Sequence, residues 1–209
     1  MSRIAIKLNR RQMDQVRLIP RGMYRHIPDA VVRALLDAGK QTVTYTNRLI
    51  RSRYNLRLAR VKRGLSYTKA SWRWGKANAA VIAKGRPINL ASFGARQTRR
   101  GVSVLVKKAR GRRLLVSRVF MPPAKGWVSA GRSGGFYMGQ TGNKTVFIRK
   151  RGAKRLPIRA LYGPSVPGIL SPDKPNADIY WKVRRRLRRI LNRRLEHQLD
   201  RILKRAGVL

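Results

Sequence analysis

The position of the acidic residues constrains this chain more than any other feature of its sequence. From Ala38 to Pro172, a stretch of 135 residues, there are 31 Lys and Arg and no Asp or Glu. Side-chain salt bridges cannot form within this stretch, so its basic groups must face water, phosphate or the acids of a partner. A solvated basic face is the usual interpretation of a short run of charge. A run of this length favours a polyanionic or acidic partner.

The remaining composition allows a folded core around this charge. The 209-residue chain has a formal net charge of +44, and 43% of its residues are apolar, an ordinary fraction for a globular protein. Self-repulsion at that charge would strain an isolated monomer at low salt, so we expect a polyanion or an assembly to supply the counter-charge. The seven acids are Asp14, Asp29, Asp37, Asp173, Asp178, Glu196 and Asp200.

Residues that usually carry catalysis or hold metals are few in this sequence. Without cysteine it forms neither a disulfide nor a cysteine zinc site, and its two histidines are too few for a histidine-rich metal site. Asp29 and Asp37 are eight residues apart on one predicted helix, too far to share a substrate proton. Asp173 and Asp178 flank a proline-containing loop. We therefore expect no enzyme activity, no cofactor and no metal.

One glycine-rich segment looks at first like a phosphate-binding loop. In Gly139–Thr145, Asn143 separates Gly142 from Lys144, whereas that loop needs Gly directly before Lys. No helix pattern follows, so a turn between two strands is favoured. The sequence also has no apolar run of the roughly 18–20 residues that cross a membrane, and we expect no signal peptide, because the first residues lack a long apolar core. We expect a protein made in a cytoplasm that stays soluble or enters an assembly there.

Apolar spacing predicts helices towards both ends of the chain. Pro28 and Asp29 suit a first turn, and apolar positions three or four apart then predict a helix over about 29–51. A short helix over 56–63 has Asn55 as its cap and Gly64 as its stop. A helix over about 177–206 would extend roughly 45 Å, and its apolar stripe packs either on the chain's own sheet or in part on another subunit. That stripe consists of Ile179, Val183, Leu187, Ile190, Leu191, Leu195, Leu199, Ile202 and Leu203.

The middle of the chain alternates apolar and polar residues instead. Strands are predicted around Tyr67 and at 77–84, 102–108, 114–121, 136–138 and 145–149, with Gly- or Pro-containing turns between them. Weaker signals predict a strand over 2–9 and helical turns over 13–19. Short connections favour antiparallel pairing.

We expect a single domain with an α+β fold. Its mainly helical part spans 1–64, and its antiparallel β part, against which the long N-terminal helix packs, spans 65–160. A rigid Gly/Pro turn and a long, basic, amphipathic C-terminal helix span 161–209.

Two clusters of basic residues are candidate contacts for DNA or for an acidic partner. They lie beside predicted turns, and such clusters bind phosphates without reading sequence. The first consists of Arg96, Arg99, Arg100, Lys107, Lys108, Arg110, Arg112 and Arg113, and the second of Arg149, Lys150, Arg151, Lys154 and Arg155. The nearby aromatic residues Trp72, Trp74, Trp127 and Tyr137 could stack on bases, although core packing is favoured. The sequence has no helix-turn-helix, RNA-recognition or zinc-finger signature.

Three separated strings are more specific than either cluster. The first lies within Tyr54–Ala70, the second is Pro87–Val104, and the third is Arg155–Pro167. In this order and spacing they resemble the minor tail protein Z family of tailed bacteriophages, over roughly residues 28–195. The residues of the third string that match the motif of this family are Arg155, Leu156, Pro157 and Ile158, followed by Gly163, Pro164, Ser165, Val166 and Pro167.

The resemblance implies a structural protein of the virion that completes the head-proximal end of a phage tail and helps it to join a DNA-filled head. It implies an α+β fold and offers no catalytic residues. The implied partners are the tail terminator, the head-completion ring proteins and the end of the tail tube or tape measure, with the chain itself in a homo-oligomeric ring. The segment 163–167 would form a rigid bend that aims the C-terminal helix.

Two other functions remain open at this point. Composition alone also fits a nucleic-acid-binding protein outside the virion, of a ribosomal or nucleoid kind. A packaging enzyme or nuclease is disfavoured, because metal-dependent cleavage needs several carboxylates in one cluster. Neighbouring genes for a tail terminator and a tape measure would favour the tail protein.

Overall fold

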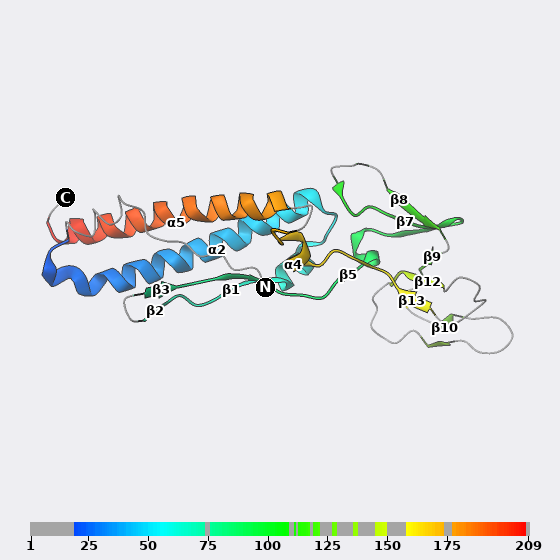
Figure 1. Ribbon diagram of the computed structural model, residues 1–209, viewed down its shortest axis with the longest axis horizontal. Coiled ribbons are helices and arrows are strands. Elements are labelled where there is room, and N and C mark those ends of the chain that lie inside the picture. Colours follow the sequence, from blue (N-terminus) through cyan, green and yellow to red (C-terminus); the bar gives the residue numbers. More distant parts are fainter. Residues whose placement is uncertain are drawn as a thin grey trace. The chain divides into compact units, whose positions relative to one another are not determined.

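The α+β fold predicted from the sequence is confirmed in a computed structural model (Figure 1). The chain divides into two compact units, here called the helical unit and the β unit. The helical unit comprises Met1–Leu49, Lys62–Gly85 and Val166–Leu209, and the β unit comprises Ile50–Val61 and Arg86–Ser165. The structure describes residues 19–73, 76–108, 111, 113–117, 119–121, 127–128, 136–137, 145–149, 158–173 and 177–207. The predicted strand at 2–9 and most of the predicted turns at 13–19 lie outside these residues.

The first long helix, α2, extends from Ile27 to Arg53 and directly follows a 3-10 helix, η1 (Arg21–His26). It confirms the helix predicted over 29–51 and adds about half a turn at each end. Pro28 lies in its first turn, where a missing N–H costs no helical hydrogen bond. Asp29 in the same turn interacts favourably with the positive end of the helix dipole.

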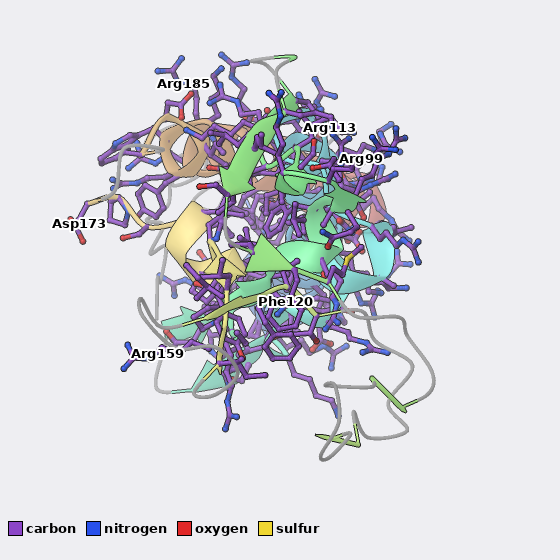
Figure 2. All side chains as sticks on the ribbon, turned by 90° about the vertical axis from the view of Figure 1, so that its right-hand side faces the viewer. Arg99, Arg113, Phe120, Arg159, Asp173 and Arg185 are labelled. Carbon is purple, nitrogen blue, oxygen red and sulfur yellow. The ribbon has the colours of Figure 1, made fainter. Side chains whose placement is uncertain are left out.

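The second long helix, α5 (Ala177–Arg205), confirms the helix predicted over 177–206. All nine residues of its predicted apolar stripe are buried. On the other faces the basic residues are mostly exposed, and Arg185 points away from the helix (Figure 2). No helix in the described part of the chain has the apolar length that a membrane crossing requires.

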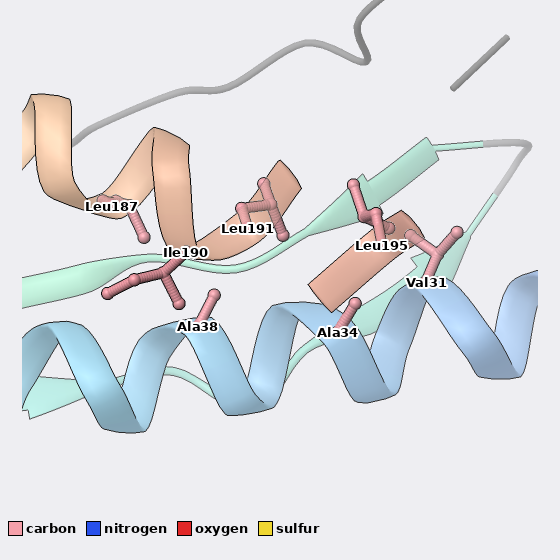
Figure 3. Close-up of a cluster of buried hydrophobic side chains, with 7 residues drawn as sticks. All are labelled: Val31, Ala34, Ala38, Leu187, Ile190, Leu191 and Leu195. Carbon is pink, nitrogen blue, oxygen red and sulfur yellow. The ribbon is translucent and has the colours of Figure 1, made fainter. Parts of the chain in front are cut away.

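The stripe of α5 packs on α2 of the same chain, and the two helices run antiparallel, side by side (Figures 1 and 3). Ala34 and Ala38 of α2 are completely or almost completely buried beneath Leu187, Ile190 and Leu191 of α5. Their small side chains let the helices approach closely. A second cluster joins Ala30 to Leu199, Ile202 and Leu203. Helix–helix contact therefore accounts for seven of the nine stripe residues, whereas the sequence pattern predicts packing on a sheet or on another subunit.

A long, irregular hairpin completes the helical unit. It consists of β1 (Leu65–Tyr67), β2 (Ser71–Arg73), β3 (Lys76–Asn78) and β4 (Val81–Ala83), with β1 paired to β4 and β2 paired to β3. The strand predicted over 77–84 is therefore wrong as one continuous strand. Between the β1–β4 pair and the β2–β3 pair the ladder is interrupted, because residues 68–70 on one side lie opposite only residues 79–80 on the other. Thr68 forms hydrogen bonds across this interruption. Its N–H donates to the Ala80 carbonyl and its hydroxyl accepts from the Ala80 N–H, both at 2.8 Å.

The short helix α3 (Leu58–Arg63) begins two residues later than predicted. Asn55 is not its cap, because the first helical bonds are accepted by the carbonyl of Arg57. The Asn55 side chain instead donates from Nδ2 to the carbonyl of Phe93, at 3.0 Å. Gly64 does follow the helix end as predicted, and a Cβ there would lie 2.9 Å from the Lys84 carbonyl oxygen.

The β unit contains several small antiparallel sheets rather than one large sheet. One three-stranded sheet has the order β6 (Arg96–Thr98), β7 (Gly101–Val104) and β8 (Leu114–Ser117), and the other has the order β13 (Ile158–Ala160), β12 (Phe147–Arg149) and β9 (Val119–Phe120). Two-stranded pairs join β5 (Ile88–Asn89) to β14 (Tyr162–Gly163), and β10 (Trp127–Val128) to β11 (Phe136–Tyr137). A 3-10 turn, η2 (Leu90–Phe93), follows β5.

Antiparallel pairing is confirmed throughout these strands, but two predicted strands are too long. The strand predicted over 102–108 ends at Val104, after which Lys107 makes only an isolated bridge to Tyr54. The strand predicted over 114–121 is split into β8 and β9. Alternation along β7 points Val102 and Val104 inwards, where both are almost completely buried.

Candidate basic interaction surface

The acidic residues are divided unequally between the two units. All seven acids belong to the helical unit, whereas the 92 residues of the β unit include 23 Lys and Arg and no Asp or Glu. No carboxylate side chain is therefore available inside the β unit to neutralise a basic group. Such a body attracts anions of any kind over a distance set by the salt concentration.

The β6–β7 hairpin presents the first basic cluster. Thr98 and Gly101 face each other across the strands, so Arg99 and Arg100 form a two-residue turn at the tip. Both arginines are exposed, as is Arg96 at the start of β6 (Figure 2 labels Arg99). The Thr98 hydroxyl donates to the Gly101 carbonyl at 2.8 Å, which closes the turn on itself. The hairpin therefore presents both guanidinium groups from a fixed backbone.

Gly101 and Gln97 anchor this hairpin to the rest of the unit. Gly101 has φ +140°, and a Cβ there would collide with the carbonyl oxygen of Val116 on β8. Gln97 donates from Nε2 to the Thr98 carbonyl at 3.0 Å and accepts at Oε1 from the Met121 N–H at 2.8 Å.

Lys107 and Lys108 follow β7 and are both exposed. The bridge between Tyr54 and Lys107, together with a 3.1 Å bond from the Asn55 N–H to the Val106 carbonyl, ties this segment to the end of α2. Two other members of the first cluster, Arg110 and Arg112, lie outside the described residues.

Arg113 differs from the rest of its cluster because its guanidinium group is engaged within the unit. Nε donates to Oγ of Ser103 at 2.7 Å, and Nη2 donates to the carbonyls of Ser103 and Gly94 at 3.0 and 2.5 Å. The side chain is half-buried and joins β7 to the end of η2 (Figure 2 shows its position). Its charge contributes to the field of the unit, but most of its donors are already used.

Most of the second cluster lies outside the described residues. The backbone of Arg149 ends β12, and the undescribed members are Lys150, Arg151, Lys154 and Arg155. The β unit has further exposed basic residues that the clusters did not include: Arg51, Arg57, Arg60, Arg86 and Arg159. Arg51, Arg57 and Arg60 lie in the basic segment 51–63, which neither cluster includes.

The segment that carries the family resemblance lies where the chain passes from one unit to the other. Gly163 ends β14, opposite Ile88, and a Cβ on it would lie 2.8 Å from Cε2 of the completely buried Phe93. The β unit ends at Ser165, and α4 (Val166–Ile169) begins at the next residue. Pro164 therefore leads into α4, and Pro167 is the second residue of that helix, which precedes α5. Arg155, Leu156 and Pro157 lie outside the described residues.

The aromatic residues named with the basic clusters belong to different units. Trp72 is 37% exposed on β2, in the helical unit. Trp127 and Tyr137 face each other across β10 and β11 of the β unit, and Trp74 lies outside the described residues. Within the described residues, no group of three or more His, Asp or Glu is placed to hold a metal ion.

Comparison with known proteins gives one match. A family model described as prophage minor tail protein Z (GPZ) matches residues 19–205, which include the whole β unit and most of the helical unit. No curated protein matches the chain significantly. No solved structure does so either.

Proposed function

Because the chain belongs to the prophage minor tail protein Z family, we propose that it completes the head-proximal end of a phage tail and helps that end to join a DNA-filled head. Membership makes the chain a structural component of a phage tail. The observation that carries the proposal is the extent of the match, which runs from before α2 to the last residue of α5. A ribosomal or nucleoid protein, which the composition also fits, has no comparable support.

The charge distribution supports a position beside a polyanion. A tail end that receives a DNA-filled head meets both the phosphates of DNA and the surfaces of ring proteins. In this proposal the β unit, which has no acid of its own, faces DNA or the acidic side chains of the tail terminator or head-completion ring. Copies of the chain form a ring at the end of the tail tube or tape measure, since head-to-tail contacts close into rings in such assemblies. DNA contact would involve phosphates and no sequence reading.

In this proposal the chain acts by binding and assembly, without catalysis. Assembly takes place in the host cytoplasm, and the protein stays in the mature virion at the neck.

A deletion of the gene tests this function. Without the chain, infected cells should accumulate DNA-filled heads and separate tails that do not join. Purified protein added to a mixture of those heads and tails should restore infectious particles. Normal infectious virions without the chain would contradict the proposal, and so would a complete absence of tails, which would place the chain at an earlier step.

A further inference from the structure

A further basic feature belongs to the helical unit, whereas both basic clusters belong to the β unit. A pocket of about 370 Å³ opens between α2 and α5, and four arginines of α5 line it: Arg186, Arg189, Arg193 and Arg194. Gln41 of α2 and His197 of α5 also line it, and no Asp or Glu does. Sequence patterns alone do not distinguish these arginines from the other basic residues of α5.

The helix period brings these residues together. Positions 186, 189, 193 and 197 lie three or four apart, so their side chains leave α5 on one face. Ile190 lies between them, 8% exposed, and belongs to the apolar cluster that joins α5 to α2. The cationic groups therefore surround a fixed apolar floor rather than projecting from a free helix.

Two of the four arginines are positioned by α2. With its amide turned so that Oε1 faces the guanidinium group, Gln41 accepts from Nε and Nη2 of Arg194 at 3.0 and 2.6 Å. The guanidinium carbon of Arg186 lies 5.7 Å from the ring centroid of Tyr45, in a cation–π contact. Gln41 and Tyr45 are one helical turn apart on the same helix, α2. Positioning of this kind lowers the entropy that a bound anion would cost.

The charge of the pocket indicates the chemistry of its ligand. Four guanidinium groups repel one another, and no carboxylate in the pocket lining offsets them. Arg186 and Arg193 are seven residues apart, roughly 10 Å along the helix axis. A DNA strand carries one phosphate for about every 3.4 Å of its axis, so one strand can offer several charges over that distance. The planar fork of arginine also matches phosphate oxygens in a bidentate manner.

We propose that this pocket binds the phosphates of a DNA backbone. None of its residues belongs to the β6–β7 hairpin, and the proposal does not depend on the place of the chain in the tail. An acidic protein segment is the competing occupant, and the experiment below distinguishes the two.

Binding of the full-length protein to a short fluorescent DNA duplex, followed by anisotropy over a series of salt concentrations, tests the site. The pocket variant is R189Q/R193Q, and the matched control is R185Q/R188Q. Both remove two charges at exposed positions of α5, but Arg185 and Arg188 do not line the pocket. The expected result is a log–log salt slope shallower by about two for the pocket variant, since each lost phosphate contact removes about 0.9. The control should change the slope by less than one. Circular dichroism should show both variants folded.

An equal change of the salt slope in the two variants would overturn the proposal, because DNA binding would then depend only on the total charge of the protein. An unchanged slope in the pocket variant would overturn it as well. Binding of a fluorescent polyglutamate peptide forms the second arm. If R189Q/R193Q weakens polyglutamate binding and leaves DNA binding intact, the occupant is an acidic protein segment and the phosphate assignment is wrong.

Discussion

Arg99 and Arg113 look equivalent in the sequence, since both belong to one basic cluster without a nearby acid. In the structure Arg99 lies exposed at a hairpin tip, whereas Arg113 donates to Ser103 and to the Gly94 carbonyl. The sequence could not separate them, because both acceptor groups of Arg113 are at least ten positions away along the chain. A hydrogen bond between distant segments leaves no local pattern.

Replacing Arg113 with Gln should therefore reduce the stability of the β unit. The shorter side chain cannot reach all three acceptors, and half-buried acceptors would lose their partners. We expect a loss of about 1–3 kcal/mol in the free energy of unfolding, measured by urea denaturation. Arg99→Gln removes the same charge at an exposed position, and its free energy of unfolding should stay within about 0.5 kcal/mol of the wild-type value. Equal losses in the two variants would contradict the role given to Arg113.

Gly163 offers a second test at the scale of one residue. In Gly163→Ala the new methyl group would lie 2.8 Å from the buried ring of Phe93, so the β14 strand or the ring has to shift. We expect a loss of about 1–3 kcal/mol in the free energy of unfolding by chemical denaturation. Gly22→Ala is the control, because nothing lies within 4 Å of its Cβ position. Gly22→Ala should not lower the free energy of unfolding. Wild-type stability of Gly163→Ala would show that Gly163 does not pack closely against Phe93.

At the scale of elements, the two long helices could be predicted almost to the residue. Their apolar positions repeat over seven to eight turns, and such a repeat is visible without any knowledge of the partner. The strands could be located only approximately, because most are two or three residues long. Their ends depend on distant contacts, such as the bridging of the β1–β4 hairpin by Thr68. The sequence pattern also does not show what the α5 stripe packs against. A helix that packs on a sheet has the same apolar stripe as a helix that packs on another helix.

The contact between α2 and α5 predicts a large effect of truncation in the α5 stripe. Leu191 is 3% exposed and belongs to the cluster with Ala34 and Ala38. Leu191→Ala should lower the free energy of unfolding by about 2–5 kcal/mol, since it leaves a cavity between the helices. Arg185→Ala, on an exposed face of α5, should change it by no more than about 0.5 kcal/mol. Thermal or urea unfolding distinguishes the two, and a small effect of Leu191→Ala would mean that the helices do not pack as described.

At the scale of the whole molecule, the separation of charge follows the separation of units. The acid-free stretch was visible in the sequence, and the structure assigns most of it to the β unit. The sequence does not show the boundaries between the units, because the β unit includes the end of α2 and the helical unit includes the 65–83 hairpin. Three separated strings of sequence carry the family resemblance, and the match over residues 19–205 confirms it.

A set of arginine replacements tests whether the β6–β7 hairpin contacts the partner. Arg96, Arg99 and Arg100 replaced together with Gln should leave the fold intact and lower the joining of tails to heads by roughly tenfold. Three exposed charge contacts of about 0.5 kcal/mol each give that factor. The matched control replaces Arg51, Arg57 and Arg60, which are exposed in the same unit. Counts of infectious particles provide the measurement, and an equal loss in both sets would show that only total charge matters.

Salt dependence tests the DNA alternative for the β unit. If this unit contacts six to ten phosphates, the log–log slope of DNA affinity against salt should be about −5 to −9. The hairpin replacements should make it shallower by two to three, at about 0.9 for each contact. A slope that the hairpin replacements leave unchanged would remove DNA as the partner of the hairpin.

Electron cryo-microscopy of purified virions tests the central claim most directly, because it locates the chain in the particle. The proposed function predicts density for the α2–α5 pair and the β unit at the head-proximal end of the tail, in a ring, with the β unit next to DNA or an acidic protein surface. Density for this chain only at the distal tip of the tail, or no copy of it in the virion, would contradict the claim.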